Sequence, residues 1–147
     1  MDSSKFVYIT YISTTPEKLW DALIKPELTT KYWQHINLSD WKPGSKWEHR
    51  SADKEHALHL VGKVIEFSPM KRLVLAWAFP ADEANEDNHS RVALDIESYR
   101  GVVRFTVTHD QLKPGSEMLE GITKGWPIVI SSMKSLLEVG QPLPELW

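Results

Sequence analysis

The segment from Gly121 to Gly140 carries an apolar stripe at helical spacing. It reads GITKGWPIVISSMKSLLEVG, and four large apolar residues recur at intervals of three and four: Trp126, Ile130, Met133 and Leu137. Residues at this spacing share one face of an α-helix. An amphipathic helix of this length gains most of its stability by covering another apolar surface, so the rest of the chain must supply that surface.

The proline in this segment bears on where the helix begins. Proline has no backbone N–H and is tolerated in the first turn of a helix, where that group would be unpaired in any case. The triplet Gly125-Trp126-Pro127 therefore predicts a helix start or a kink. We interpret the triplet as structural, with the Trp126 ring directed toward the surface that the helix covers.

The N-terminal segments predict one strand and two short helices. In KFVYITYIST, β-branched and aromatic residues place alternate side chains on opposite faces of a strand. The period then becomes helical, with Thr14 or Thr15 as the N-cap residue, Pro16 in the first turn and Pro26 at the end. A second short helix is expected from Glu27 to about Tyr32.

From Leu38 onward the sequence is typical of an antiparallel sheet. About five strands separated by turn residues are predicted in DWKPGSKWEHRS, HALHLVGKVIEFSP, RLVLAWAF, SRVALDIES and VVRFTVTHD. The whole order predicts an α+β fold with the helices on one side of the sheet. Five or six twisted strands curve, so a long helix on the concave side can leave a cavity between helix and sheet.

Composition limits the domain organisation and the partners. The 147 residues have the length and apolar content of one domain, so we expect a single domain over residues 1–147. A net charge of -3 with scattered basic residues favours neither nucleic acid nor an anionic membrane. The chain has no cysteine, no signal-peptide pattern and no apolar run long enough for membrane insertion, which predicts a cytoplasmic protein.

Four stretches resemble a known family. TTPEKLWDALIKPELTTKYW, SDWKPGSKWEHR, LVGKVIEFSPMKRLVLAWAF and GWPIVISSMKSLLE are similar to the helix pair, turn, hairpin and closing helix of the START-like (SRPBCC, Bet v 1-like) superfamily, within its Activator of Hsp90 ATPase homologue-like group. The resemblance implies a helix-grip fold, in which a curved antiparallel sheet wraps around a long C-terminal helix. The superfamily includes lipid and hormone carriers and polyketide cyclases. Eukaryotic Hsp90 activators also carry a separate chaperone-binding domain, so we do not expect a chaperone partner here.

Seven tryptophans in 147 residues either fill a core or line a cavity. The strand parities, the helix stripe and the resemblance together place twelve side chains on the facing surfaces. For each of them the alternative is ordinary core packing or, for a histidine, a hydrogen-bonded buried side chain. The predicted lining is Trp33, His35, Trp47, His49, Leu75, Trp77, Phe79, Phe105, His109, Trp126, Ile130 and Met133.

No metal or cofactor is predicted. His56 and His59 are three residues apart, which suits metal ligands on a helix, but on a strand they point to opposite faces. The sequence has no nucleophile elbow, phosphate-binding glycine loop or paired-carboxylate motif.

These observations lead us to expect a protein that binds a small hydrophobic, lipid-like or aromatic ligand in its cavity, without a catalytic residue. One alternative is a cyclase- or hydrolase-type enzyme that uses His49, His109 and Arg91. Another is a protein-interaction module, which would expose an apolar patch. Homodimerisation through an outer face or a sheet edge is compatible with the sequence.

Overall fold

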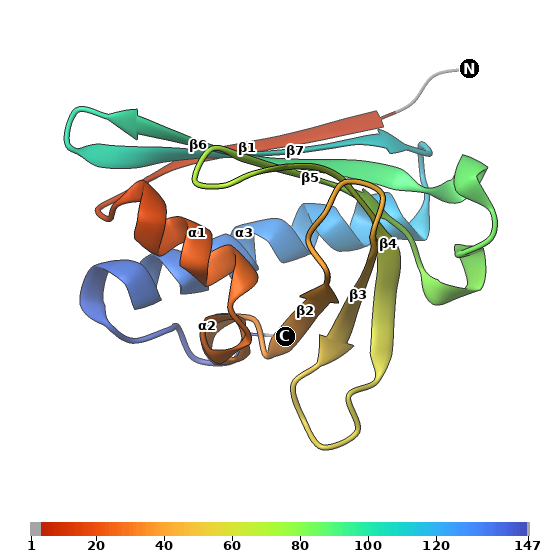
Figure 1. Ribbon diagram of the computed structural model, residues 1–147, viewed down its shortest axis with the longest axis horizontal. Coiled ribbons are helices and arrows are strands. Elements are labelled where there is room, and N and C mark those ends of the chain that lie inside the picture. The colour runs from red at the N-terminus through yellow and green to blue at the C-terminus, as the bar shows by residue number, and fades with distance from the viewer. Residues whose placement is uncertain (1–3, 147) are drawn as a thin grey trace.

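The computed structural model describes residues 4–146, and apart from one additional strand its helices and strands follow the order that the sequence predicts (Figure 1). The elements are β1 (Ser4–Ile12), α1 (Pro16–Ile24), α2 (Pro26–Tyr32), β2 (His35–Ser39), β3 (Lys46–Ser51), β4 (Leu58–Ser68), β5 (Arg72–Trp77), the 3-10 turns η1 (Pro80–Asp82) and η2 (Glu86–Asn88), β6 (Ser90–Tyr99), β7 (Val102–Leu112) and α3 (Glu117–Val139).

The strands form one antiparallel seven-stranded sheet in the order β1-β7-β6-β5-β4-β3-β2. Figure 1 shows the sheet bending at β4, so that β2 and β3 turn away from the layer formed by β1, β7, β6 and β5. The long helix α3 lies on the concave side, with α1 and α2 beside it. The predicted α+β helix-grip fold is confirmed.

One strand was not predicted. β2 is the five-residue segment HINLS, which pairs with β3 from His35 opposite Ser51 to Ser39 opposite Trp47. Its apolar residues alternate with polar ones over five positions only, and the buried residue at its centre is polar, so the strand signal in the sequence is weak. The sheet therefore has seven strands rather than the expected five or six.

The bend in β4 depends on a glycine. β4 pairs with β3 up to Lys63 and with β5 from Val64 onward, so the strand passes from one part of the sheet to the other at this point. A Cβ atom on Gly62 would lie 1.7 Å from the backbone oxygen of Ala76. Only glycine allows the two backbones to approach this closely.

The first helix is capped as the sequence predicts. The Thr15 side chain accepts a hydrogen bond from the backbone N–H of Lys18 at 3.2 Å, and Pro16 occupies the first turn. α2 begins at Pro26, one residue before the expected start, and reaches Tyr32. The short pair brings Trp33, immediately after α2, to the concave side of the sheet.

The C-terminal helix is longer than predicted. It begins at Glu117, where the Ser116 hydroxyl accepts a hydrogen bond from the Leu119 N–H at 3.1 Å, and ends at Gly140 in the left-handed conformation. Pro127 therefore lies inside the helix, so of the two expectations for Gly125-Trp126-Pro127, a helix start or a kink, the helix start is wrong. The serine cap lies just after the Pro-Gly turn, where proline and glycine favoured a loop.

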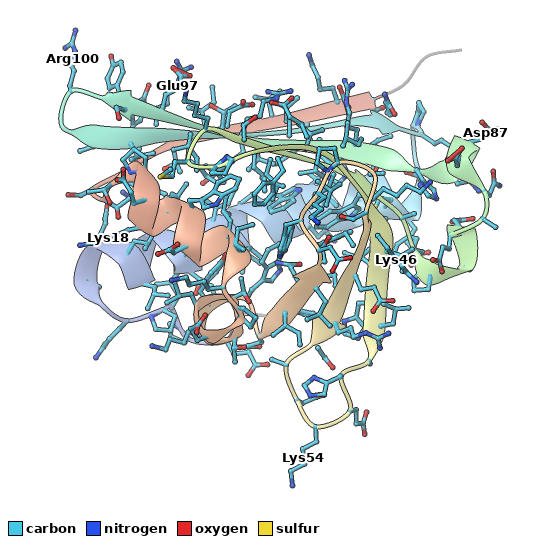
Figure 2. The ribbon with its side chains drawn as sticks, viewed as in Figure 1. Lys18, Lys46, Lys54, Asp87, Glu97 and Arg100 are labelled. Carbon is cyan, nitrogen blue, oxygen red and sulfur yellow. The ribbon has the colours of Figure 1, made fainter. Side chains whose placement is uncertain are left out.

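The concave side of the sheet, α1 and α3 enclose one cluster of buried apolar residues with members from all three α-helices and from every strand except β2. Charged side chains such as Lys54, Glu97 and Arg100 project outward from the molecule in Figure 2. Within residues 4–146, none of the helices is long and apolar enough to cross a membrane.

Candidate functional site

A cavity of about 220 Å³ lies between the N-terminal half of α3 and the concave face of the sheet. Its lining is almost wholly apolar and aromatic. The exposed Glu117 and Gly121 on α3 mark the side on which it meets solvent. The lining residues are Trp33, His49, Leu60, Trp77, Phe79, Glu117, Met118, Gly121, Ile122, Gly125, Trp126 and Val129.

Two glycines on α3 keep the space open. Gly121 and Gly125 are four residues apart and so lie on the same face of the helix. A Cβ atom built on either one meets nothing within 4 Å. Glycine inside a helix is less favourable than alanine by roughly 0.5–1 kcal/mol. Alanine at either position would therefore make α3 more stable, but its side chain would take up part of the cavity.

Three tryptophans surround the inner part of the cavity. The centroid of the Trp126 ring lies 5.6 Å from that of Trp33 and 5.4 Å from that of Trp77. Behind them, Trp47 stacks on Trp77 at 4.8 Å and is fully buried. Trp77 of β5, Trp126 of α3 and Trp33 after α2 thus meet at one apolar space.

His49 is the buried titratable side chain of the lining. Its Nδ1 atom donates to Asn37 Oδ1 at 2.7 Å, and the His35 ring stacks on it at 4.4 Å. Burial lowers the pKa of His49 well below its usual value, and the neighbouring His35 and His59 lower it further. The imidazole is therefore neutral at pH 7.

His109 has a different environment, because both of its nitrogens are occupied. Ser90 donates its hydroxyl proton to the Trp77 carbonyl at 2.9 Å, so the hydroxyl oxygen must accept from His109 Nε2 at 2.8 Å. His109 Nδ1 then accepts from Trp126 Nε1 at 3.1 Å. Burial lowers the pKa of His109 to about 4. This histidine connects α3 to three neighbouring strands and has no nitrogen available for proton transfer.

His35 lies outside the cavity. Its Nδ1 atom donates to the Trp33 carbonyl at 2.8 Å, which leaves Nε2 to accept from Nδ1 of the exposed His59 at 2.9 Å. Burial lowers the pKa of His35. Within residues 4–146, no group of three or more His, Cys, Asp or Glu side chains is arranged to hold a metal ion.

The twelve predicted lining residues separate into two groups. Those that line the cavity are Trp33, His49, Trp77, Phe79 and Trp126. Those that do not are His35, Trp47, Leu75, Phe105, His109, Ile130 and Met133. Trp47, Phe105 and Met133 are at most 1 % exposed and belong to the packed core, as the core alternative supposed. The cavity thus lies beside the N-terminal half of α3, whereas the C-terminal half packs tightly.

The predicted catalytic group of the enzyme alternative does not assemble. Arg91 lies on the outer face of β6, where its guanidinium donates to Asp110 at 2.8 Å. Its neighbours in β6, Ser90 and Val92, face the core. Because side chains alternate along a strand, Arg91 and His109 lie on opposite faces of the sheet.

Most of the helical part of the lining was not predicted from the sequence. Met118, Gly121 and Ile122 precede the triplet Gly125-Trp126-Pro127, at which a helix start or a kink was predicted, and Gly125 belongs to that triplet. Met118 and Ile122 continue the four-residue spacing of Trp126 toward the N-terminus. An earlier helix start, marked by Ser116, would have included them.

The chain matches one protein family and is similar in fold to several solved structures. Residues 13–138 match the family described as Activator of Hsp90 ATPase homolog 1-like protein. The solution structure of the Aha1 dimer from Colwellia psychrerythraea is similar, with 18 % identity, a TM-score of 0.74 and coverage of 93 % of this chain and 98 % of that one. Protein MLL2253 from Mesorhizobium loti has 22 % identity and a TM-score of 0.74, covering 91 % and 96 %.

CalU16 from Micromonospora echinospora is also similar, with 16 % identity, a TM-score of 0.74 and coverage of 97 % of this chain and 78 % of that one. At these identities the similarity establishes the fold alone. No functionally curated protein matches the chain.

Proposed function

The chain belongs to the Activator of Hsp90 ATPase homolog 1-like family, and on that premise we propose that it binds a small, uncharged aromatic molecule in the cavity between α3 and the sheet. The observation that carries the proposal is a cavity of about 220 Å³ lined by Trp33, Trp77, Phe79 and Trp126. Aromatic walls of this kind suit a flat apolar ligand, because ring-to-ring contacts add to the gain from burying apolar area.

The volume limits the size of the ligand. An engineered apolar cavity of roughly 150 Å³ binds benzene, whereas drug-sized ligands occupy about 300 Å³ or more. A space of about 220 Å³ therefore suits one or two fused rings.

The charges of the lining limit the ligand further. No Lys or Arg occurs among the described residues that line the cavity, and Glu117 is an exposed carboxylate on its solvent side. An anionic ligand would lose its hydration without gaining a cation.

The test is a thermal-shift titration with naphthalene and related one- and two-ring compounds. A ligand that binds the native state alone must raise the melting temperature as its concentration rises. Tryptophan fluorescence provides a second readout, because three indole rings surround the cavity. Unchanged melting temperatures and unchanged fluorescence across the whole panel would refute the proposal.

A matched pair of variants locates the binding site. Gly125→Leu places a side chain in the cavity from a position with free space around it, and it replaces a poor helix former with a good one. We expect this variant to keep or raise the melting temperature of the free protein and to lose the ligand-induced shift. Lys124→Leu, on an exposed position of the same helical turn, should retain that shift. Equal binding by both variants would place the ligand elsewhere.

A second observation supports self-association. Four large side chains on the outer surface are between 41 % and 47 % exposed: Val7, Ile9 and Tyr11 of the edge strand β1, and Tyr99 of β6. The Tyr11 and Tyr99 rings lie 5.3 Å apart. Because the similar Colwellia protein is a dimer in solution, we propose that a second copy of this chain covers the strip.

Light scattering coupled to size-exclusion chromatography tests this proposal. Ile9→Lys should shift the protein toward the monomer, since a charge in the strip would lose its hydration in the interface. Ile65→Lys is the control, because Ile65 is 50 % exposed on β4 and three strands separate β4 from β1. A monomeric wild-type protein at high concentration would refute the dimer.

A further inference from the structure

The cavity lining contains a hydrogen-bond acceptor that no described residue uses. His49 Nδ1 must carry the imidazole proton, because it donates to the amide oxygen Asn37 Oδ1 at 2.7 Å. The neutral ring has one N–H only, so Nε2 carries a lone pair. His49 is 3 % exposed and lines the cavity, and among residues 4–146 the hydrogen bond of its ring is the one that Nδ1 makes to Asn37.

The surroundings of His49 keep it in this acceptor form. The ring is packed between Trp33, at 4.7 Å, and the parallel ring of His35, at 4.4 Å. Burial and the two nearby histidines hold its pKa well below the usual value. No carboxylate is among the groups that shift the pKa of His49, and Glu117 of the lining lies on the solvent side. At neutral pH, Nε2 therefore accepts hydrogen bonds and does not donate them.

A second unpaired polar group lies close by. The Trp77 ring also lines the cavity, at 6.0 Å from the His49 ring, and its indole N–H is buried without a partner among the described residues. Native proteins contain few buried polar groups without partners, because each loses its hydration without compensation. The Trp77 N–H is thus a buried donor without a partner beside the His49 ring.

We propose that the ligand is a neutral arene that bears a hydroxyl group, such as a phenol or a naphthol, and that its O–H donates to His49 Nε2. This inference rests on the proposed function, and it names the class of ligand that the same cavity selects. A carboxylate or a phenolate has no proton to donate to His49.

The experiment compares two ligands of nearly the same shape, 2-naphthol and 2-methylnaphthalene, by isothermal titration calorimetry. Their affinity ratio is measured in the wild-type protein and in His49→Phe, which keeps a ring but removes the acceptor. Comparing ratios cancels the difference in hydration between the two ligands. We expect the affinity for 2-naphthol, divided by the affinity for 2-methylnaphthalene, to be about tenfold lower in the variant than in the wild-type protein. This is the size of effect that an ordinary hydrogen bond gives.

The outcomes distinguish this inference from the proposed function. If neither compound binds the wild-type protein, the proposed aromatic ligand fails. If both bind and the ratio is the same in His49→Phe, the cavity stands and the role of His49 fails.

A second measurement needs no substitution, and it serves where the unpaired Asn37 oxygen prevents His49→Phe from folding. The ¹⁵N chemical shift of a histidine nitrogen depends on whether its lone pair accepts a hydrogen bond. We expect the His49 Nε2 resonance of the wild-type protein to move when 2-naphthol is added and to change little with 2-methylnaphthalene. The same response to both ligands would overturn the proposal.

Discussion

His109 illustrates how a single residue connects the helix to the sheet. Its two nitrogens bind Ser90 and Trp126, and the Ser90 hydroxyl continues the chain to the Trp77 carbonyl. Protonation at Nδ1 would remove the acceptor that the Trp126 indole uses. The histidine that sequence analysis proposed for a cavity is therefore part of the support behind the cavity wall.

We predict that the protein loses stability between about pH 6.5 and pH 4. The pKa of His109 is lowered to about 4 and that of His49 is also lowered, so both groups bind protons more readily in the unfolded chain. Their contribution is complete above the unfolded pKa of about 6.5 and is lost as the pH falls toward the folded value. For His109 alone the loss is on the order of 3 kcal/mol.

Urea unfolding followed at several pH values measures this loss, and an NMR titration assigns it to individual histidines. A pKa near 6.5 for His109 in the folded protein would contradict the prediction.

At the scale of the elements, the bend of β4 depends on one hydrogen atom in place of a side chain. We predict that Gly62→Ala destabilises the protein by more than about 2 kcal/mol, because its Cβ would lie 1.7 Å from the Ala76 oxygen and the backbone would have to shift. Gly121→Ala is the matched control. Its Cβ has free space and lies on a helix, so it should stabilise by roughly 0.5–1 kcal/mol.

Chemical denaturation of the two variants and the wild-type protein measures both effects. Equal stabilities for Gly62→Ala and the wild type would show that the close contact at the bend is relieved at little cost.

The sequence predicted the faces of the elements better than their ends. The alternation in β7 and the stripe on α3 correctly place Phe105, Ile130 and Met133 on the side where helix and sheet meet. Periodicity identifies a face, but it does not reveal how far apart two faces lie along their length. The gap opens where α3 has two glycines, and the absence of a side chain at these positions leaves no mark in an apolar periodicity.

The strand β2 was not predicted, and the reason lies in one of its residues. β2 has a buried asparagine, Asn37, at its centre, where a predicted strand would have an apolar residue. The Asn37 side chain accepts a hydrogen bond from His49 Nδ1. The residue that weakens the strand pattern therefore also holds the His49 ring in place at the cavity.

At the scale of the whole molecule, one buried cluster joins the three α-helices to six strands. We therefore predict that the chain unfolds in a single cooperative step, as expected for one domain over residues 1–147. Tryptophan fluorescence and far-ultraviolet circular dichroism should report the same midpoint in urea. Two separate midpoints would indicate two units that unfold independently.

The two glycines on α3 also make the interior volume adjustable. Alanine or valine at position 121 or 125 would extend from the helix into empty space, so the volume of the cavity can be reduced in steps without altering the sheet. The surrounding indoles would report occupancy through their emission without an added dye. Under the proposed function, the same scaffold could be tuned into a set of optical sensors for small aromatic compounds.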